Sequence, residues 1–561
     1  MEFLLKKKER RKVIRTIFEA VILIVLFIVT FRALFVFKHY TPYDYRDKKI
    51  VTEEDNGFIA VSYLAVDRNG SPSMIRTERL EEHLKALKKN GYVTITQKDI
   101  ENYYDNNKPL PKKSLFLMFE DGRKDTVIFA QKIMEKYNYI GTIFTYAEKF
   151  AEKDSKFLMP NDIKKLLKNS YWELGSNGYR LSYINVFDRN HNYLGELSSK
   201  EFVQLRNHIS GEYNEYLMDF IRDENNIPKE TKDEMTSRIA SDYSLMKKVY
   251  TEEFGEVPGV YAIMHSNTGS FGSNEKASEV NEEWLKKIFS MNFNREGNSY
   301  NKGRNDIYDL TRVQPQAYWY TNHLLMRIAE DTKDKLNFVV GDLKKSKEWN
   351  LIKGACEYNG ATIALTSKPK GNGLIRLRSD KLRDVHLTVQ LLGNKLGTQA
   401  IYLRADELCK RYLSVKVQND FLIIEENGEK IFEKNLTKLN KINNSTIQMN
   451  EAGNYLVDVT LKRDSINVEI NNKKVVNDLI VSNQSSGDLY LASTASKYGY
   501  RQRNIVDDVY DGVFQDLVVY KISEENHNKI IFDNRLKGQD KVKEEVKDGW
   551  ERVVNWFIKN L

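Results

Sequence analysis

Residues 115–125 read LFLMFEDGRKD, a short apolar strand that ends in two carboxylates and a glycine. From residue 58 onward, short apolar runs of this kind alternate with segments whose leucines recur on one helical face. Repeated strand and helix units predict an α/β domain with a mostly parallel sheet, closed into a barrel. Because chemistry in such barrels sits at the carboxyl ends of the strands, Glu120 and Asp121 occupy the position of a functional site.

The order of these segments carries a resemblance. The succession VSYLAV, LEEHLKALKKNGYVTIT, LFLMFEDGRKDT, KYNYIGTIFTY and WELGSNGYRLS resembles the polysaccharide deacetylase family (the NodB-homology domain), in particular its extracellular branch acting on poly-N-acetylglucosamine. The resemblance implies a distorted (β/α) barrel in which one aspartate and two histidines hold a divalent metal, usually zinc, that activates water against an acetamide carbonyl. It implies a general-base position for Glu120 and a metal-ligand position for Asp121.

The second motif departs from the family pattern. Asn177 and Leu181 stand where the family has its two histidines, four residues apart. Leu181 cannot bind a cation, and Asn177 offers only a neutral carbonyl oxygen, which leaves fewer than the three protein ligands that a catalytic zinc needs. The late acid histidine of the family is also not found after LTRVQPQAYW. We therefore expect no cofactor, and zinc or another divalent metal only if an active deacetylase has rearranged its ligands.

Other side chains are candidates for glycan binding, each with a plainer alternative. His265 is the only histidine near a predicted strand end, and it could be a surrogate ligand or simply a hydrogen-bonded loop residue. Trp172 and Tyr179 could be platforms for a sugar ring or core aromatics. Tyr498 and Tyr500, in KYGYRQRN, could form a glycan or partner surface or be solvated. The Glu120–Asp121 pair could itself merely complete a turn.

The N-terminus predicts a membrane anchor. The segment KKKERRKVIR supplies seven Lys and Arg against one Glu, and the apolar run that follows spans 21 residues from 17 to 37, about the length needed to cross the bilayer. The basic flank orients the N-terminus to the cytoplasm and the bulk of the chain to the outside. A cleaved signal peptide is the alternative, but FRALFVFKHY lacks a small-x-small cleavage site.

A change of period near residue 336 marks a second domain. In YLVDVTL, Tyr455, Val457, Val459 and Leu461 share one face, which is typical of a strand with one buried side. Repeated short strands and polar turns predict an all-β, antiparallel jelly-roll sandwich, and their pattern resembles the concanavalin/laminin-G-like sandwiches of carbohydrate-active proteins. Cys356 and Cys409 are the only cysteines, and they could form one bridge or remain free thiols.

The C-terminal segment has an apolar face at helical spacing, which could pack on the chain's own domains, lie in a membrane interface or dock on a membrane partner. The predicted boundaries are 1–16 for a cytoplasmic basic tail, 17–37 for the anchor, 38–57 for a linker, 58–335 for the deacetylase-like domain with an insertion at about 188–232, 336–523 for the sandwich and 524–561 for an amphipathic helix.

Charge and composition limit the function classes. The formal net charge is +8, but most of it lies in the N-terminal segment, so no nucleic-acid surface is expected. The sequence predicts a single-pass cell-membrane protein, exposed outside, whose deacetylase-like barrel is catalytically impaired and which binds or guides an exopolysaccharide. Its expected partners are that cell-surface polysaccharide and a membrane glycosyltransferase or synthase. Two alternatives stay open: an active metal-dependent N-deacetylase with rearranged ligands, and a noncatalytic scaffold of a glycan synthase complex.

Overall fold

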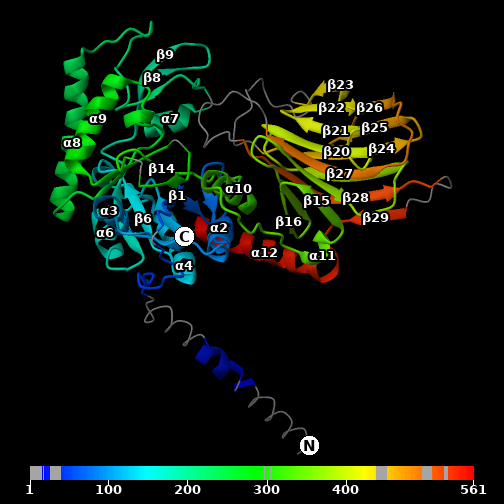
Figure 1. The fold of residues 1–561 in the computed structure, drawn as a ribbon, viewed down its shortest axis with the longest axis horizontal. Helices are drawn as coiled ribbons and strands as arrows, with labels where there is room; N and C mark the ends of the chain where they lie inside the picture. Colours follow the sequence, from blue (N-terminus) through cyan, green and yellow to red (C-terminus); the bar gives the residue numbers. More distant parts are fainter. Residues whose placement is uncertain are drawn as a thin grey trace, which may run out of the picture.

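The computed structural model describes residues 15–16, 18–25, 39–52, 54–206, 208–295, 297–303, 306–436, 452–495, 508–523 and 529–560. Within this part of the chain, a barrel and a pair of antiparallel sheets lie side by side (Figure 1). The barrel strands, in sheet order, are β1 (Phe58–Tyr63), β5 (Ser114–Phe119), β6 (Gly141–Thr145), β7 (Trp172–Ser176), β11 (Val260–Ala262), β12 (Met291–Asn294) and β14 (Leu310–Thr311). Each of these strands runs parallel to its neighbour, as the alternation of strands and helices predicts.

The barrel closes between its first and last strands. Just after β14, Val313 forms a parallel bridge with Val61 of β1. The Val313 amide donates to the Ala60 carbonyl at 3.0 Å, and the Ser62 amide donates to the Val313 carbonyl at 2.9 Å. Short strands complete the edges: β4 (Val93–Thr94) beside β5, β13 (Tyr300–Asn301) antiparallel to β1, and the pair β2 (Val66–Asp67) and β3 (Ile75–Arg76).

Helices surround this sheet. They are α2 (Thr77–Lys89), α3 (Gln97–Asn106), α4 (Lys124–Tyr137), α5 (Lys149–Glu152), α6 (Pro160–Leu166), α8 (Lys232–Phe254), the 3₁₀ turn η1 (Gly269–Phe271), α9 (Glu275–Ile288) and α10 (Thr321–Thr332). The leucine face predicted for the first helix is confirmed, because Leu80, Leu84 and Leu87 of α2 are fully buried. These leucines pack in one cluster with the outward-facing side chains of β1 and β5, which attaches the helix to the barrel.

An excursion follows β7. It comprises β8 (Ser182–Phe187), β9 (Tyr193–Ser198), α7 (Ser199–Leu205) and β10 (Asn214–Glu215), whose strands form a small antiparallel sheet in the order β10-β8-β9. This excursion thus begins at Ser182, earlier than the insertion predicted at about 188–232, and it contains a small sheet as well as a helix. Because it leaves from the carboxyl end of β7, it lies at the barrel end that carries Glu120 (Figure 1).

The second domain packs two antiparallel sheets against each other. One has the order β15 (Trp349–Lys353), β18 (Asn372–Leu377), β27 (Asp488–Ala495), β20 (Gly397–Ala405), β21 (Leu413–Gln418), β22 (Phe421–Glu426), β23 (Glu429–Asn435). The other has β16 (Ala355–Asn359), β17 (Thr362–Thr366), β28 (Asp511–Lys521), β19 (Val385–Leu391), β24 (Tyr455–Lys462), β25 (Ser465–Ile470), β26 (Lys473–Ile480), with β29 (Lys529–Asp533) beside β28. Buried side chains of both sheets share one core. The predicted antiparallel architecture is present, while the concanavalin-like resemblance stays a prediction.

The ends of this domain differ from the predicted boundaries. Strand β29 lies within segment 524–561, which we expected to be helical, because its backbone continues the sheet beyond β28. The C-terminal helix α12 therefore begins only at Gly538 and runs to Asn560, and the short helix α11 (Leu343–Ser346) leads into β15. Cys356 and Cys409 are both free thiols, so of the two alternatives left open by the sequence the unbridged one holds.

The predicted anchor, 17–37, lies mostly outside the described residues. Its described part, 18–25, is helical and exposes its apolar side chains. Among all the residues that the structure describes, no helix is both long enough and apolar enough to cross a bilayer.

The barrel and the sandwich are joined by a buried polar contact. The carboxylate of Asp511, at the start of β28, accepts hydrogen bonds from the Tyr320 amide at 2.9 Å and from the Thr366 hydroxyl at 2.6 Å. Its Oδ2 also lies 3.0 Å from Nδ1 of His323 on α10. Since these groups are buried and satisfied by one another, they fix α10 of the barrel against the sandwich.

Candidate functional site

The carboxyl ends of the barrel strands bring together a set of polar residues. We call this end the barrel mouth, defined by Ser62 (β1), Glu120 (after β5), Tyr146 (after β6), Asn177 (after β7), His265 (after β11), Arg295 (after β12) and Arg312 (after β14). Parallel strands place their carboxyl ends at one edge, so residues far apart in the sequence meet here. The mouth is therefore the candidate site, as the FEDG segment predicts.

Glu120 lies in a fully buried ion pair. The Nε atom of Arg312 donates to Oε1 of Glu120 at 2.7 Å, and both side chains have no solvent exposure. The hydroxyl of Ser62 donates to the same oxygen. The Arg312 guanidinium also donates to the carbonyls of Phe293 at 2.9 Å and Ile263 at 2.7 Å. The position expected for a general base is thus part of a charged clamp that holds the ends of five strands together, β1, β5, β11, β12 and β14.

Asp121 sits in a tight turn beside this pair. Its φ of 68° and that of Gly122 at 60° lie in the left-handed region, and a side chain at residue 122 would meet Thr145 at 2.8 Å, so glycine is required there. Burial raises the pKa of Asp121 to about 7, although Arg123 and Lys149 partly oppose the shift. Its carboxyl group is consequently poised to carry a proton near neutral pH, which weakens it as a cation ligand.

Asn177 uses both ends of its amide for structure. Its Nδ2 donates to the Ala262 carbonyl at 2.7 Å, and its Oδ1 accepts the Asp121 amide at 3.3 Å. The side chain is buried, so neither atom is available to a ligand. Asn177 therefore joins the end of β7 to the end of β11 and to the Asp121 turn.

Leu181 takes part in an apolar cluster. It packs with Tyr183, Val186, Leu197 and Ile209, which form the core of the β8–β9 excursion. Leu181, where the resemblance implies a second histidine, thus belongs to the core of the excursion. A leucine here is explained by packing, and it leaves no ligand atom at that place.

His265 faces a cationic environment. Burial, together with the charges of Arg295, Arg312 and Arg206, lowers its pKa to about 3, so the imidazole is neutral at physiological pH. Its ring lies 6.1 Å from that of Tyr183 on the excursion. In the part of the chain that the structure describes, no group of three or more His, Cys, Asp or Glu side chains is placed to hold a metal ion. The residues present at the mouth do not fit a metal site of the family type.

The mouth nevertheless retains polar atoms without assigned partners. Oε2 of Glu120 and the hydroxyls of Tyr146, Ser182 and Thr268 are buried and have no hydrogen-bond partner among the described residues. Burial strongly raises the pKa of Tyr146, and the charges of Asp121 and Glu120 add to the shift. Buried donors and acceptors of this kind are costly unless water or a ligand satisfies them. The mouth and the segments beside it therefore hold buried polar groups that water or a polar ligand would satisfy.

The aromatic candidates divide into two groups. Trp172 is buried at the start of β7, where its indole nitrogen donates to Gln131 and its ring contacts Phe119, so it is a core residue and cannot be the glycan platform we considered. Tyr179 is half-buried near the mouth, with the Arg180 guanidinium 4.9 Å above its ring. Tyr498 and Tyr500 lie outside the described residues.

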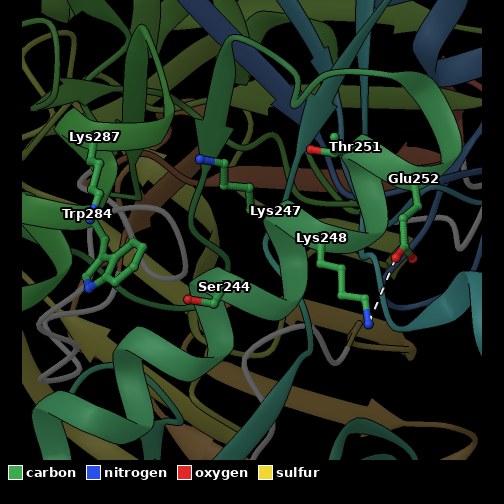
Figure 2. Close-up of a pocket in the computed structure, with 7 residues that line it drawn as sticks. All are labelled: Ser244, Lys247, Lys248, Thr251, Glu252, Trp284 and Lys287. Atoms are coloured by element: carbon green, nitrogen blue, oxygen red, sulfur yellow. Dashed lines mark ion pairs between the residues drawn. The ribbon is translucent and has the colours of Figure 1, made fainter.

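A pocket of about 440 Å³ lies away from the mouth, between α8 and α9 (Figure 2). It is lined by Ser244, Lys247, Lys248, Thr251, Glu252, Trp284 and Lys287. The Lys287 ammonium lies 4.5 Å from the Trp284 ring, and Lys248 pairs with Glu252 at 3.9 Å. An indole beside lysines and hydroxyls can contact a sugar ring and its polar substituents, so the pocket is a second candidate glycan surface.

The sequence analysis did not identify Arg312, the residue that forms the buried ion pair with Glu120. It directly follows the two-residue strand β14, which is too short to be recognised from hydrophobic alternation. The signal was present in LTRVQ, where a charged residue follows the buried pair Leu310 and Thr311 as Glu120 follows its strand. Arg295 and Tyr146 follow β12 and β6 in the same way, and both are buried.

Comparison with known proteins supports the family resemblance. No protein-family model matches the chain. The poly-beta-1,6-N-acetyl-D-glucosamine N-deacetylase of Escherichia coli O157:H7 is 26% identical over 122 residues, which cover 20% of this chain and 18% of that protein. YxkH of Bacillus subtilis (strain 168), described as a polysaccharide deacetylase, is 28% identical over 85 residues, covering 15% of this chain and 30% of that protein. The chain thus matches less than a third of the length of either relative.

Among solved structures, the de-N-acetylase from Aggregatibacter actinomycetemcomitans aligns with 48% of this chain and 99% of its own, at 16% identity and a TM-score of 0.38. That score is too low to establish a shared fold. The sequence similarity to the curated relatives is the stronger finding, and it confirms the prediction that this chain resembles the polysaccharide deacetylases.

Proposed function

We propose that this chain is a membrane-anchored extracellular protein that binds a cell-surface polysaccharide through a deacetylase-like barrel without metal-dependent hydrolysis. Its relatives are described as N-deacetylases of poly-N-acetylglucosamine or of polysaccharides, which supports a glycan ligand of that class. On this proposal the chain guides or holds an exopolysaccharide during its synthesis or modification, beside a membrane glycosyltransferase or synthase.

The Glu120–Arg312 pair is the observation that carries the proposal. A general base must be within reach of the water that it activates, either directly or through one other water. Here Oε1 of Glu120 is engaged by a guanidinium and a hydroxyl, and the whole carboxylate lies in a place that solvent does not reach. The two positions where the resemblance implies metal-binding histidines also support the proposal, because Asn177 makes a structural hydrogen bond and Leu181 packs in an apolar cluster.

The polar atoms of the mouth support binding in place of catalysis. The hydroxyls of Tyr146, Ser182 and Thr268 are suited to the hydroxyl and amide groups of a sugar, and Tyr179 offers an aromatic face nearby. A pure scaffold that never touches sugar would gain nothing from keeping such groups buried, since an apolar interior would be more stable.

Metal content and acetate release test the proposal directly. The purified full chain in detergent is analysed for bound metal after incubation with zinc, and acetate is measured with N-acetylglucosamine oligomers. We expect no stoichiometric zinc and no acetate above background, together with measurable oligomer binding by calorimetry. Stoichiometric zinc and acetate release that Asp121→Ala abolishes and the matched control Asp125→Ala preserves would show an active deacetylase.

Binding variants separate the glycan binder from the scaffold. Tyr179→Ala is expected to weaken oligomer binding if the mouth is the site, and Trp284→Ala if the α8–α9 pocket contributes. Trp172→Phe, which alters a core indole far from both surfaces, serves as the control. Absence of binding by the unmodified chain would favour the scaffold alternative.

A further inference from the structure

Helix α12 exposes an apolar stripe. Five large side chains along it, Val542, Val546, Trp550, Val553 and Trp556, are between 47% and 66% exposed. At 100° per residue their spacing places them within about a third of the helix circumference. Soluble proteins rarely leave so continuous an apolar surface open to water, so this stripe indicates a contact surface.

The side of the same helix next to the protein includes half-buried Val554 as well as polar residues. Lys547 pairs with Glu78 at the start of α2, at 3.2 Å, and Glu551 on the same side is half-buried. A surface helix of a globular protein normally buries its apolar face and exposes its polar one. α12 instead leaves its five-residue apolar stripe exposed, so its outer face is suited to contact something apolar.

The chain just after the predicted anchor is held tightly to the barrel. The Tyr40 amide donates to the Ser170 hydroxyl at 2.7 Å, the Thr41 amide to Asn138 at 3.0 Å, and the Tyr171 hydroxyl to the His39 carbonyl at 3.2 Å. Ser170 and Asn138 precede β7 and β6, so this attachment lies at the amino ends of the strands, opposite the mouth. Because the predicted anchor ends at residue 37, almost no slack separates the barrel from the bilayer.

The two exposed apolar surfaces lie on the same side of the molecule. In Figure 1, α12 runs along the lower side of the two domains, and the helical residues 18–25 lie below them. Residues 18–25 contribute six of the 29 exposed large apolar side chains among the described residues, and α12 contributes five. An anchor in the bilayer would therefore bring α12 toward the same lipid surface.

We propose that α12 lies in the membrane interface with its apolar stripe against the lipid, as a second attachment point, and that the barrel mouth faces away from the bilayer. This inference rests on the proposed membrane anchoring. Tryptophans such as Trp550 favour the interface, where one side of the indole meets apolar chains and the nitrogen meets water.

The charges of α12 define the kind of lipid contact. Five basic residues are balanced by five acidic ones: Lys541, Lys543, Lys547, Arg552 and Lys559 against Asp540, Glu544, Glu545, Asp548 and Glu551. Attraction to anionic headgroups therefore contributes little, and apolar burial carries the binding. Contact with lipid should be nearly independent of salt and of anionic lipid content.

Depth-dependent quenching tests the inference in the full chain. The protein, with Cys409→Ser, is reconstituted into phosphatidylcholine vesicles and carries one fluorophore at Val546→Cys, or at Glu544→Cys on the opposite face as the matched control. Cys356 is buried and remains in place. We expect lipids with a spin label near the headgroup to quench the label at residue 546 severalfold more than that at 544, at low and high salt.

A third label, at Ile24→Cys, tests the membrane anchor separately from the lipid contact of α12. Quenching at residue 24 with equal quenching at 546 and 544 would overturn the α12 contact and leave the anchor intact. No quenching at residue 24 would overturn both. Disulfide crosslinking between copies through Val546→Cys, at high lipid-to-protein ratio, would instead assign the stripe to self-association. Trp550→Glu with Trp556→Glu should abolish quenching at 546 and leave quenching at 24 unchanged.

Discussion

The interior of the sandwich and the interior of the barrel mouth are built in opposite ways. In the sandwich, side chains alternate along strands such as β24: Val457 and Val459 are buried, Leu456 between them is 37% exposed, and one large hydrophobic cluster joins the two sheets. At the mouth, a carboxylate and a guanidinium, 192 residues apart in the chain, are both fully buried. The comparison teaches that an apolar interior is set by local alternation and a polar one by pairing between distant residues.

The largest expected loss of stability follows from breaking the buried ion pair between Glu120 and Arg312. Arg312→Leu leaves Glu120 buried without its counter-ion and the Phe293 and Ile263 carbonyls without donors. We expect the free energy of unfolding to fall by about 3–5 kcal/mol. Urea denaturation, followed by circular dichroism with the full chain in detergent, measures it.

A double-mutant cycle sharpens this prediction. Glu120→Leu with Arg312→Leu removes both charges, so it should be less destabilising than the sum of the two single substitutions. Additive losses would mean that the pair contributes no coupling, and the contrast between the two interiors would then fail.

A smaller loss is expected at Asn177. Asn177→Ala removes the bonds to the Ala262 carbonyl and the Asp121 amide and leaves those backbone groups unpaired inside the protein. The expected cost is about 1–3 kcal/mol. Asn106→Ala is the control, because the exposed Asn106 amide bonds the Asn102 side chain on the same helix and its loss leaves no backbone group unpaired. A comparable loss there would show that the effect is not specific to the mouth, and thermal melting distinguishes the cases.

A core substitution in the sandwich should cost less stability than one at the mouth, and the loss should not depend on salt. Ile466→Val removes one methylene from a fully buried side chain of β25. The expected loss is about 0.5–1.5 kcal/mol, equal at low and high salt because the surrounding core is apolar. A loss that varied strongly with salt would contradict the apolar description of this interior.

The smallest expected effect is on the pH dependence of stability, at Glu357 of β16. Burial raises the pKa of Glu357 to about 7, with Glu82 and Asp511 adding to the shift and Arg79 opposing it. A raised carboxyl pKa means that the folded state binds the proton more tightly than the unfolded one, so stability is greatest at low pH and falls as pH rises toward 7. Glu357→Gln should flatten this part of the profile, measured as the urea midpoint between pH 5 and 8. An unchanged slope would contradict the assignment.

Much of the fold could be predicted from local pattern. The leucines of α2 and the alternation in β24 each follow a period of one element, and both match the structure. The excursion and β29 were misplaced, because short strands beside polar turns carry too little periodicity to mark where they begin.

The candidate site was harder to predict because the role of each residue depends on contacts with residues far away in the sequence. The sequence placed Glu120 and Asp121 at a strand end and identified Asn177 and Leu181 as departures. It could not indicate that Arg312 would neutralise Glu120, since that contact depends on barrel closure. For Trp172 the sequence left a sugar platform and a core aromatic open, and the structure places it in the core, at the start of β7 and therefore at the opposite end from the mouth.

The closure of the barrel through Val61 and Val313 has a consequence for biosynthesis. Strand β1 emerges early from the ribosome, yet the backbone groups that complete its outer side belong to a segment made more than two hundred residues later. Until then the nascent sheet has an open edge that can pair with other chains. We expect translational stalling before residue 313 to yield aggregation-prone fragments, whereas a stall after it would release a domain that can complete itself.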